Sequence, residues 1–298
     1  IGNGDLLITL DRLYRVRDIY YPHVGRFNHT EGHVQRFGVW ADGQFAWIED
    51  ATWKRELRYR PDTLVTDVTL VNEQLGLELH CSDAVDFHEP VYFRRTVVRD
   101  LSGKSRDVRL FFHWDLSIAG TPVGDTANYD PATSSLVFYK DDHYFLFNAC
   151  DEFKCGVDHW AIGSKRVGGA EGTWRDAEDG VLGRNAISQG SVDATVGFSL
   201  QVPARGESYV SAWLICGRSY DDVKRLNRRI NEAGSVAMIA RTEVHWRLWA
   251  RKEPVDLSCL PEPVRDLFYR SQLVMRTQID NGGAIIAAND SDITQFAG

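Results

Sequence analysis

The sequence predicts a mainly β protein: a large antiparallel super-β-sandwich of two sheets over residues 1–217, which passes into helices. Short runs rich in β-branched and aromatic residues, separated by Gly, Asp and Asn, continue to about Cys216. The strands do not alternate with helices, as they would in a parallel sheet. After Gly217 the apolar residues recur at helical spacing instead. Two packed antiparallel sheets followed by a helical region are the simplest architecture for this order.

Three pairs of strands can be placed in the sandwich region. The predicted pairs are 37–40 with 45–48, 93–99 with 107–113, and 136–139 with 144–148. In the first pair, Asp42-Gly43 supplies the positive φ angles that a tight hairpin turn needs. In the second pair, the predicted inward positions are Val97, Val108, Leu110 and Phe112. The stretch 163–189 is rich in Gly, Asp and Arg, which predicts a long surface excursion that could contact a neighbour.

Three helices are predicted after the sandwich. Ser219 is a candidate N-cap for the first, whose apolar face contains Val223, Leu226 and Ile230. The second is predicted over 235–252 and the third over about 264–278, after a proline-rich connector. Three helices at one end cannot bury their own apolar faces. We therefore expect the chain to stop in the middle of a domain and to be one portion of a larger protein.

Charge and cysteine content narrow the possible functions. The 42 acidic and 34 basic residues are interspersed and give a net charge of −8, so nucleic acid is not a predicted partner. No apolar run approaches the roughly 20 residues that span a bilayer, so no membrane partner is predicted and the expected location is cytoplasmic. Five cysteines at scattered spacings predict reduced, mostly buried thiols. No nucleotide-binding glycine pattern is present, and no cofactor is predicted.

Several strings along the chain resemble glycoside hydrolase family 15, the glucoamylase-like enzymes, in their bacterial and archaeal form. The strings are IGNG at 1–4, RDIYYP at 17–22, GVW at 38–40, FRR at 93–95, VRLFF at 108–112, GTWRDAEDG at 172–180 and GGAIIAANDSD at 282–292. The last one resembles the segment that follows the first helix of that family's (α/α)6 barrel. The resemblance therefore covers nearly the whole chain.

The resemblance implies three parts and an activity. Residues 1–217 would form the N-terminal β-sandwich domain, 218–262 a helical linker, and 263–298 the first helix and following loop of an incomplete (α/α)6 barrel. The whole enzyme would release sugar from the non-reducing end of an α-glucoside with inversion, using two barrel glutamates. Those glutamates have no counterpart here, so the resemblance implies no catalytic residue in this chain and no activity for the chain alone.

Two segments are candidate substrate-contacting sites. By their position in the resemblance, Asn289 and Asp290 would touch or support substrate at the pocket edge, although they could instead cap the next helix. The polar, glycine-rich loop containing His29 and His33 could lean towards the barrel and form a pocket rim. These two histidines lie four residues apart beside Glu31, but Gly and Asn make the segment a loop, and we predict no metal site.

Two functions are compatible with the sequence. In the first, the chain is a platform for the catalytic barrel of the same protein, which acts on an α-glucan or α-glucoside. In the second, it is a carbohydrate-binding module that holds α-glucan on exposed tryptophans, of which the chain has nine. Most large aromatic residues fill cores, which favours the platform.

Overall fold

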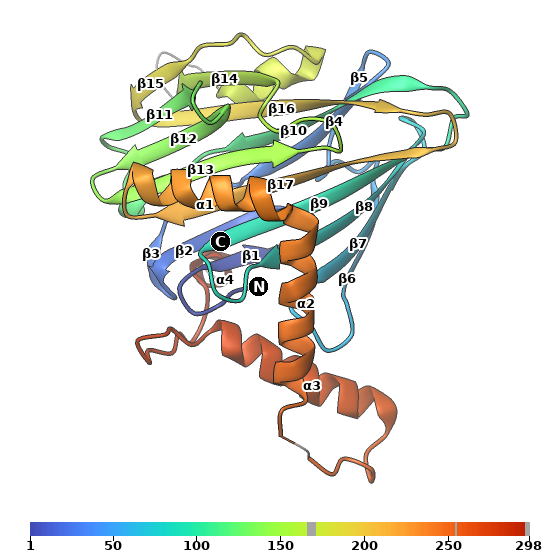
Figure 1. Cartoon of the computed structure of the whole chain (residues 1–298), viewed down its shortest axis with the longest axis vertical. Coiled ribbons are helices and arrows are strands. Elements are labelled where there is room, and N and C mark those ends of the chain that lie inside the picture. Colours follow the sequence, from blue (N-terminus) through green and yellow to red (C-terminus); the bar gives the residue numbers. More distant parts are fainter. Residues whose placement is uncertain (166–170, 254, 296–298) are drawn as a thin grey trace.

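The computed structural model describes residues 1–165, 171–253 and 255–295. Its strands form three antiparallel sheets, of nine, five and three strands (Figure 1). The nine-stranded sheet contains, in spatial order, β15 (Ile187–Gly190), β11 (Asp125–Asp130), β12 (Ser135–Lys140), β13 (His143–Cys150), β17 (Glu207–Gly217), β9 (Val91–Asp100), β8 (Leu77–Val85), β7 (Thr66–Asn72) and β6 (Lys54–Tyr59). The five-stranded sheet contains β14 (His159–Ser164), β16 (Val192–Val202), β10 (Arg106–Trp114), β4 (Arg36–Ala41) and β5 (Gln44–Trp47). The smallest contains β1 (Leu7–Leu10), β2 (Val16–His23) and β3 (Arg26–Asn28).

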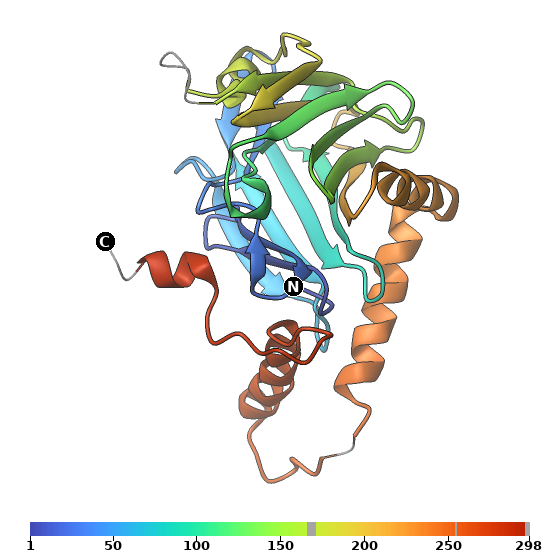
Figure 2. The ribbon, with the colours of Figure 1, turned by 90° about the vertical axis from the view of Figure 1, so that its left-hand side faces the viewer.

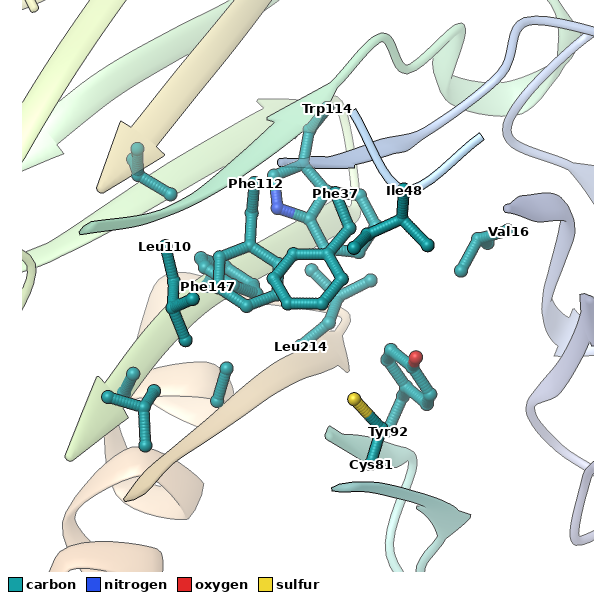
Figure 3. Close-up of a cluster of buried hydrophobic side chains, with 14 of the residues drawn as sticks. Val16, Phe37, Ile48, Cys81, Tyr92, Leu110, Phe112, Trp114, Phe147 and Leu214 are labelled. Carbon is teal, nitrogen blue, oxygen red and sulfur yellow. The ribbon is translucent and has the colours of Figure 1, made fainter. Parts of the chain in front are cut away.

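The main hydrophobic core lies between the two larger sheets (Figure 3). Phe37 of β4 stacks on Phe112 of β10, with ring centroids 4.8 Å apart. Phe147 of β13, in the opposite sheet, lies 5.1 Å from Phe112 and 5.1 Å from Trp114. Such close aromatic packing contributes beyond the area it buries. The predicted mainly β fold with antiparallel sheets is confirmed, and its core has the position that a sandwich requires.

A second core covers the outer face of the nine-stranded sheet. The helices that follow β17 are α1 (Tyr220–Ala233), α2 (Ser235–Ala250), α3 (Glu262–Thr277) and α4 (Asp290–Gln295). Ser219 caps α1 by accepting from the backbone N–H of Asp222, as predicted. The predicted apolar face of α1 is buried against Phe93 and Trp213, whose indole N–H donates to Asn227 at 2.9 Å. None of the helices in the described ranges is long and apolar enough to cross a membrane.

Two of the three predicted strand pairs form hairpins. β4 pairs with β5 through Asp42 (φ 52°) and Gly43 (φ 79°), which provide the predicted turn. β12 pairs with β13, where Tyr139 and Tyr144 stack. The third prediction is wrong in its pairing: β9 lies in the nine-stranded sheet and β10 in the five-stranded sheet.

The turn between β9 and β10 crosses from one sheet to the other because Asp100 holds it. This carboxylate accepts from the backbone N–H groups of Ser102, Gly103 and Lys104 at 2.7–3.1 Å, and from that of Arg205 at 3.0 Å. Burial disfavours the charged carboxylate, but these hydrogen bonds hold the pKa of Asp100 well below its usual range. Four backbone N–H groups bound to one buried carboxylate thus fix an arch, a turn that connects strands of two different sheets. The sequence predicted a hairpin at this place.

The excursion predicted over 163–189 folds back onto the outer face of the five-stranded sheet. Residues 166–170 lie outside the described ranges, and a short 3-10 helix (Thr173–Asp179) follows them. Trp174 packs edge-on against Trp47, and Arg36 lies 5.0 Å from the ring centre of Trp174. Part of the excursion therefore covers its own sandwich. Its predicted contact with a neighbour stays a prediction.

The prediction of reduced thiols is wrong for two cysteines. Cys150 and Cys155 form a disulfide across a loop at the end of β13, with their Cα atoms 4.1 Å apart. Cys81 and Cys216 are free and buried, and Cys259 is free and exposed. Scattered spacing gave no hint of this pair, because only the fold of the loop brings the two residues together. The predicted cytoplasmic location stays a prediction.

Removing this disulfide with Cys155→Ser is expected to lower the free energy of unfolding by about 2 kcal/mol, because the bond restricts a short loop in the unfolded chain. Urea unfolding under non-reducing conditions measures the loss. Dithiothreitol should produce the same loss in the wild type and no further loss in the variant. Equal stability of oxidised and reduced wild-type protein would contradict the prediction.

Candidate functional site

The segment after α3 lies along the three-stranded sheet (Figure 2). The backbone N–H of Asn281 donates to the carbonyl of Gly4 at 3.0 Å. The buried carboxylate of Asp280 accepts from the backbone N–H of Val24 at 2.9 Å. Ile286 packs on a small buried cluster that contains Val24 and Tyr20. Polar and apolar contacts thus hold residues 280–292 against β1 and β2.

Asp18 of β2 is the centre of this contact. Its side chain is completely buried and accepts hydrogen bonds from Thr9 Oγ1 at 2.6 Å and Asn28 Nδ2 at 2.8 Å. It also accepts from the backbone N–H and the hydroxyl of Ser291, at 3.2 and 2.5 Å. A buried carboxylate is stable when several donors satisfy it. Asp18 therefore attaches the first turn of α4 to the sheet.

Asn289 and Asp290, the two predicted substrate-contacting residues, lie at this attachment point. The backbone N–H of Asp290 donates to the hydroxyl of Tyr20 at 2.7 Å, and Asn28 Nδ2 donates to its carboxylate at 3.1 Å. The carbonyl of Asn289 accepts from the backbone N–H of Asp292 at 3.0 Å, so Asn289 begins α4. The side-chain oxygen of Asn289 has no hydrogen-bond partner among the described residues, so it does not cap α4, and the carboxylate of Asp290 stays exposed.

An open polar cleft of about 590 Å³ lies beside these residues, between the turn from β1 to β2 and the start of α4. Its charged and amide side chains are Asp11, Arg12, Arg15, Arg17, Asn289 and Asp292. Arg15 and Arg17 both approach the carboxylate of Asp11, at 2.7 and 3.6 Å. Guanidinium, amide and carboxylate groups are the hydrogen-bonding groups that fix the orientation of a polar ligand in a pocket. The cleft is therefore suited to a ligand rich in hydroxyl groups.

His29 lies inside the domain. It is completely buried: its Nε2 donates to the carbonyl of Tyr21 at 2.7 Å, and its Nδ1 accepts from the backbone N–H of Ala119 at 3.1 Å. Burial lowers the pKa of His29 to about 3, so the ring is neutral. This hydrogen bonding positions the loop and leaves His29 no surface in this chain for a ligand.

His33 lies in a different cluster from Asn289 and Asp290. Its Nδ1 is 3.0 Å from Asp115, which also forms an ion pair with the buried Lys165. Burial works against the charged carboxylate, but the hydrogen bond from His33 and the charge of Lys165 hold the pKa of Asp115 at about 2. The described part of the chain contains no group of three or more His, Cys, Asp or Glu side chains that could hold a metal ion.

Sequence reasoning missed Asp18 and the arginines of the cleft. Asp18 and Tyr20 lie on one face of β2, opposite Thr9 and Leu7 of β1, and both are buried. A carboxylate at an inward position of an apolar strand needs hydrogen-bond donors, which was the available signal. The arginines of the β1–β2 turn gave no signal, because a charged turn is most simply a solvated one.

His29 makes stability depend on pH. Its folded pKa of about 3 lies below the unfolded value near 6.5. Between these values the unfolded chain binds the proton, so stability falls as the pH falls from about 6.5 towards 3. His29→Gln is expected to reduce the dependence of the unfolding free energy on pH by about 1.4 kcal/mol per pH unit between pH 6 and 4.

Urea unfolding at several pH values measures this slope. His88→Gln, at an exposed position, is the control for replacing a histidine. An unchanged slope in the His29 variant would mean that His29 is protonated in the folded state.

Comparison with known proteins identifies the type of fold. No protein-family model matches the chain. An uncharacterized glycosyl hydrolase of Methanocaldococcus jannaschii is 22% identical over 206 residues, which are 68% of this chain and 31% of that protein. This chain therefore spans about a third of the length of this curated relative.

Two solved structures extend the comparison. A bacterial glucoamylase complexed with acarbose superimposes with a TM-score of 0.72 and 13% identity, over 93% of this chain and 39% of that one. A glycosyl hydrolase of family GH92 superimposes with a TM-score of 0.51 and 13% identity, over 97% of this chain and 41% of that one. At such identities the likeness concerns the fold. The chain therefore has a glycosyl hydrolase-like fold.

Proposed function

We propose that this chain is the N-terminal, non-catalytic part of a glucoamylase-like glycoside hydrolase and serves as a platform for an (α/α)6 catalytic barrel. In this proposal residues 1–217 form the sandwich, 218–262 the helical linker and 263–298 the beginning of the barrel. The whole enzyme would hydrolyse α-glucosidic bonds with inversion, using two barrel glutamates outside this chain. The chain alone is then inactive.

The main observation that supports this proposal is the exposed apolar face of α3. One side of α3 faces the sandwich, where Leu273 is fully buried and Arg270 donates to backbone carbonyls of the loop before β7. The opposite side exposes apolar residues at helical spacing, with exposed fractions of 44% at Val264, 63% at Leu267 and 58% at Met275. A helix that is apolar on two sides is stable in water only when both sides are covered.

A second surface extends this face. An open cleft of about 360 Å³ between α2 and α3 is lined by Trp249, Met275 and Ile279. Its apolar walls fit the ridge of another helix. The occupant we propose is the barrel of the same protein, because the curated relative and the glucoamylase are each more than twice as long as the region they share with this chain.

The polar cleft supplies the proposed contact with substrate. Asn289 and Asp290 are proposed to lie at the edge of a pocket for an α-glucan or α-glucoside, completed by the barrel. The exposed carboxylate of Asp290, and the guanidinium of Arg12 in the lining of the cleft, are suited to hydrogen bonding with sugar hydroxyl groups.

The tryptophans argue against the alternative, an independent carbohydrate-binding module. Trp47, Trp53, Trp114, Trp213 and Trp246 are buried. The remaining four are partly exposed, and each has a cation over its ring: Arg109 over Trp40, Arg184 over Trp160, Arg175 over Trp174 and Lys252 over Trp249. A sugar would have to displace these cations before it could stack.

Activity assays on two forms of the protein test the proposal. The full-length protein should release glucose from maltooligosaccharides, and the 298-residue chain should release none. Leu267→Asp in the full-length protein should lower activity, because a charge would enter the proposed contact with the barrel. Val123→Asp, at an exposed apolar position on the sandwich, is the matched control.

Three outcomes would overturn parts of this proposal. Sugar release by the 298-residue chain would show that catalysis does not need a barrel. Binding of maltooligosaccharides to this chain more tightly than about 1 mM would favour the module. Full activity of the Leu267→Asp protein would show that α3 is not the contact.

A further inference from the structure

The loop closed by Cys150 and Cys155 presents an exposed aromatic side chain on a fixed backbone. Phe153 is 92% exposed. The carboxylate of Asp151 accepts from the backbone N–H groups of Phe153 and Lys154 at 2.7 and 2.8 Å. The backbone N–H of Asp151 donates in turn to the carbonyl of Lys154 at 3.0 Å. A disulfide and three hydrogen bonds therefore fix the loop backbone that carries Phe153, so the loop loses little entropy on binding.

A basic groove lies directly beside this loop. The groove has a volume of about 630 Å³ and runs between α1 and residues 132–134, with Cys155 in its wall. Its cationic side chains are Lys224, Arg225 and Arg228, and its lining includes the carboxylate of Asp221. Arg225 also lies 3.7 Å from Asp222 and Arg228 lies 3.8 Å from Glu232, in exposed ion pairs of the kind that contribute little and exchange readily. Cys150 Sγ lies 3.7 Å from Asn231 Oδ1, which also lines the groove, so loop and groove form one continuous surface. We call the loop 150–155 and this groove the α1 patch.

The two halves of the α1 patch are complementary in charge and shape. The loop protrudes and carries Glu152, which is exposed and has no ion-pair or hydrogen-bond partner in the described ranges. The groove is concave, and its lining has a net positive charge. A protruding acidic, aromatic loop next to a basic groove is what an isologous two-fold interface needs, because each copy must supply both halves of the contact.

We propose that the α1 patch binds the α1 patch of a second copy of this chain across a two-fold axis. Phe153 of each copy enters the groove of the other, and Glu152 lies against Arg225 and Arg228 of its partner. The exposed aromatic residue supplies the apolar anchor, and the charges set the register.

This interface is independent of the platform function. α1 and α3 lie at different levels along the long axis of the molecule in both views (Figures 1 and 2). The outer face of α3 and the polar cleft share none of the residues that line the groove. Pairing through the α1 patch therefore leaves the proposed barrel contact free.

Sedimentation velocity over a concentration series tests the pairing. The chain should form a dimer with a dissociation constant below about 100 µM. Phe153→Ala should weaken it by about 30-fold, because the anchor is lost. Glu152→Arg alone, and Arg225→Glu with Arg228→Glu, should each weaken it by at least about tenfold.

Mixing the two charge-reversal proteins gives the decisive result. In each homodimer both contacts pair like charges, whereas a mixed dimer has two contacts of opposite charge. The mixture should therefore dimerise about as tightly as the wild type, because each loop then meets a groove of opposite charge, and closure at the dimer without larger species indicates a two-fold contact. Asp67→Arg, on the exposed face of β7, makes the same charge change away from the patch and should have no effect.

Three results would overturn the proposal. The wild-type chain could stay monomeric over the whole series. It could form a dimer that Phe153→Ala leaves unchanged, which would place the interface elsewhere. The charge-reversal proteins could stay monomeric when mixed, which would mean that Glu152 does not face Arg225 and Arg228 in the dimer. Circular dichroism of every variant checks that loss of the dimer is not loss of the fold.

Discussion

Asp83→Ala is expected to lower the free energy of unfolding by about 3–5 kcal/mol. Asp83 is fully buried, and it accepts from the hydroxyl groups of Tyr92 and Thr66 at 2.5 and 2.8 Å and from Arg94 Nε at 2.7 Å. Arg94 is only 5% exposed, so without Asp83 its charge would stay buried with no counter-charge. Removing one partner of a buried pair costs far more than removing both. Urea unfolding at pH 7 measures the loss.

Two variants separate the charge effect from a general weakening of the core. Asp83→Leu combined with Arg94→Met should recover most of the loss, because neither charge is then buried. Asp67→Ala, at an exposed position on β7, should change stability by less than about 0.5 kcal/mol. If Asp83→Ala alone cost less than about 1 kcal/mol, water would have to reach Arg94, and the ion pair would contribute little.

Asp18→Ala is expected to release the start of α4 from the sheet. The carboxylate accepts two hydrogen bonds from Ser291 and one each from Thr9 and Asn28. Leaving buried donors unpaired costs about 1–3 kcal/mol each. The local opening free energy of residues 289–293 should fall by about 2 kcal/mol. Hydrogen exchange at those amides should then become about 30-fold faster, as mass spectrometry can measure.

Asp11→Ala is the matched control, because Asp11 lies in the same turn region but pairs with Arg15 and Arg17. It should leave exchange at residues 289–293 unchanged. Exchange that is equally fast in the wild type and in Asp18→Ala would mean that other contacts, such as that of Ile286, fix the segment.

The sequence predicts hairpins well because the residues that form the turn lie between the two strands that pair. Asp42 and Gly43 adopt the positive φ angles that form the turn between β4 and β5, and both residues lie within the turn itself. The arch after β9 has a different origin: Asp100 accepts from Arg205, more than a hundred residues away. No pattern within residues 93–113 shows that contact.

One inward position was also misassigned. Val97 was predicted to point inward, whereas Val98 is buried in the main core and Val97 is partly exposed. The charged residue Arg94 is one of the inward residues of β9. An assignment of inward positions from hydrophobicity alone therefore chooses the wrong face of this strand. Phe93, on its other face, is buried by α1 and α2.

In the candidate site, too, features that depend on contacts between distant residues could not be predicted from the sequence. Asn289 lines a polar cleft, and the substrate contact that the resemblance implies for Asn289 and Asp290 stays a prediction. The role of Asp18 depends on Ser291, which is distant in sequence and reaches it only through the path of the chain after α3. His29 looked like a loop residue available to a ligand, and its burial depends on contacts with Tyr21 and Ala119.

The last two strands of the sandwich occupy central positions: β16 between β14 and β10, and β17 between β13 and β9. Before β16 is synthesised, β14 has no partner in the five-stranded sheet, and before β17 is synthesised the nine-stranded sheet consists of two separate halves. Neither sheet can complete its hydrogen bonding until its central strand is present. Contacts between distant strands slow folding and expose strand edges in the meantime. Formation of the two complete sheets should therefore be late, because it waits first for β16 and then for β17.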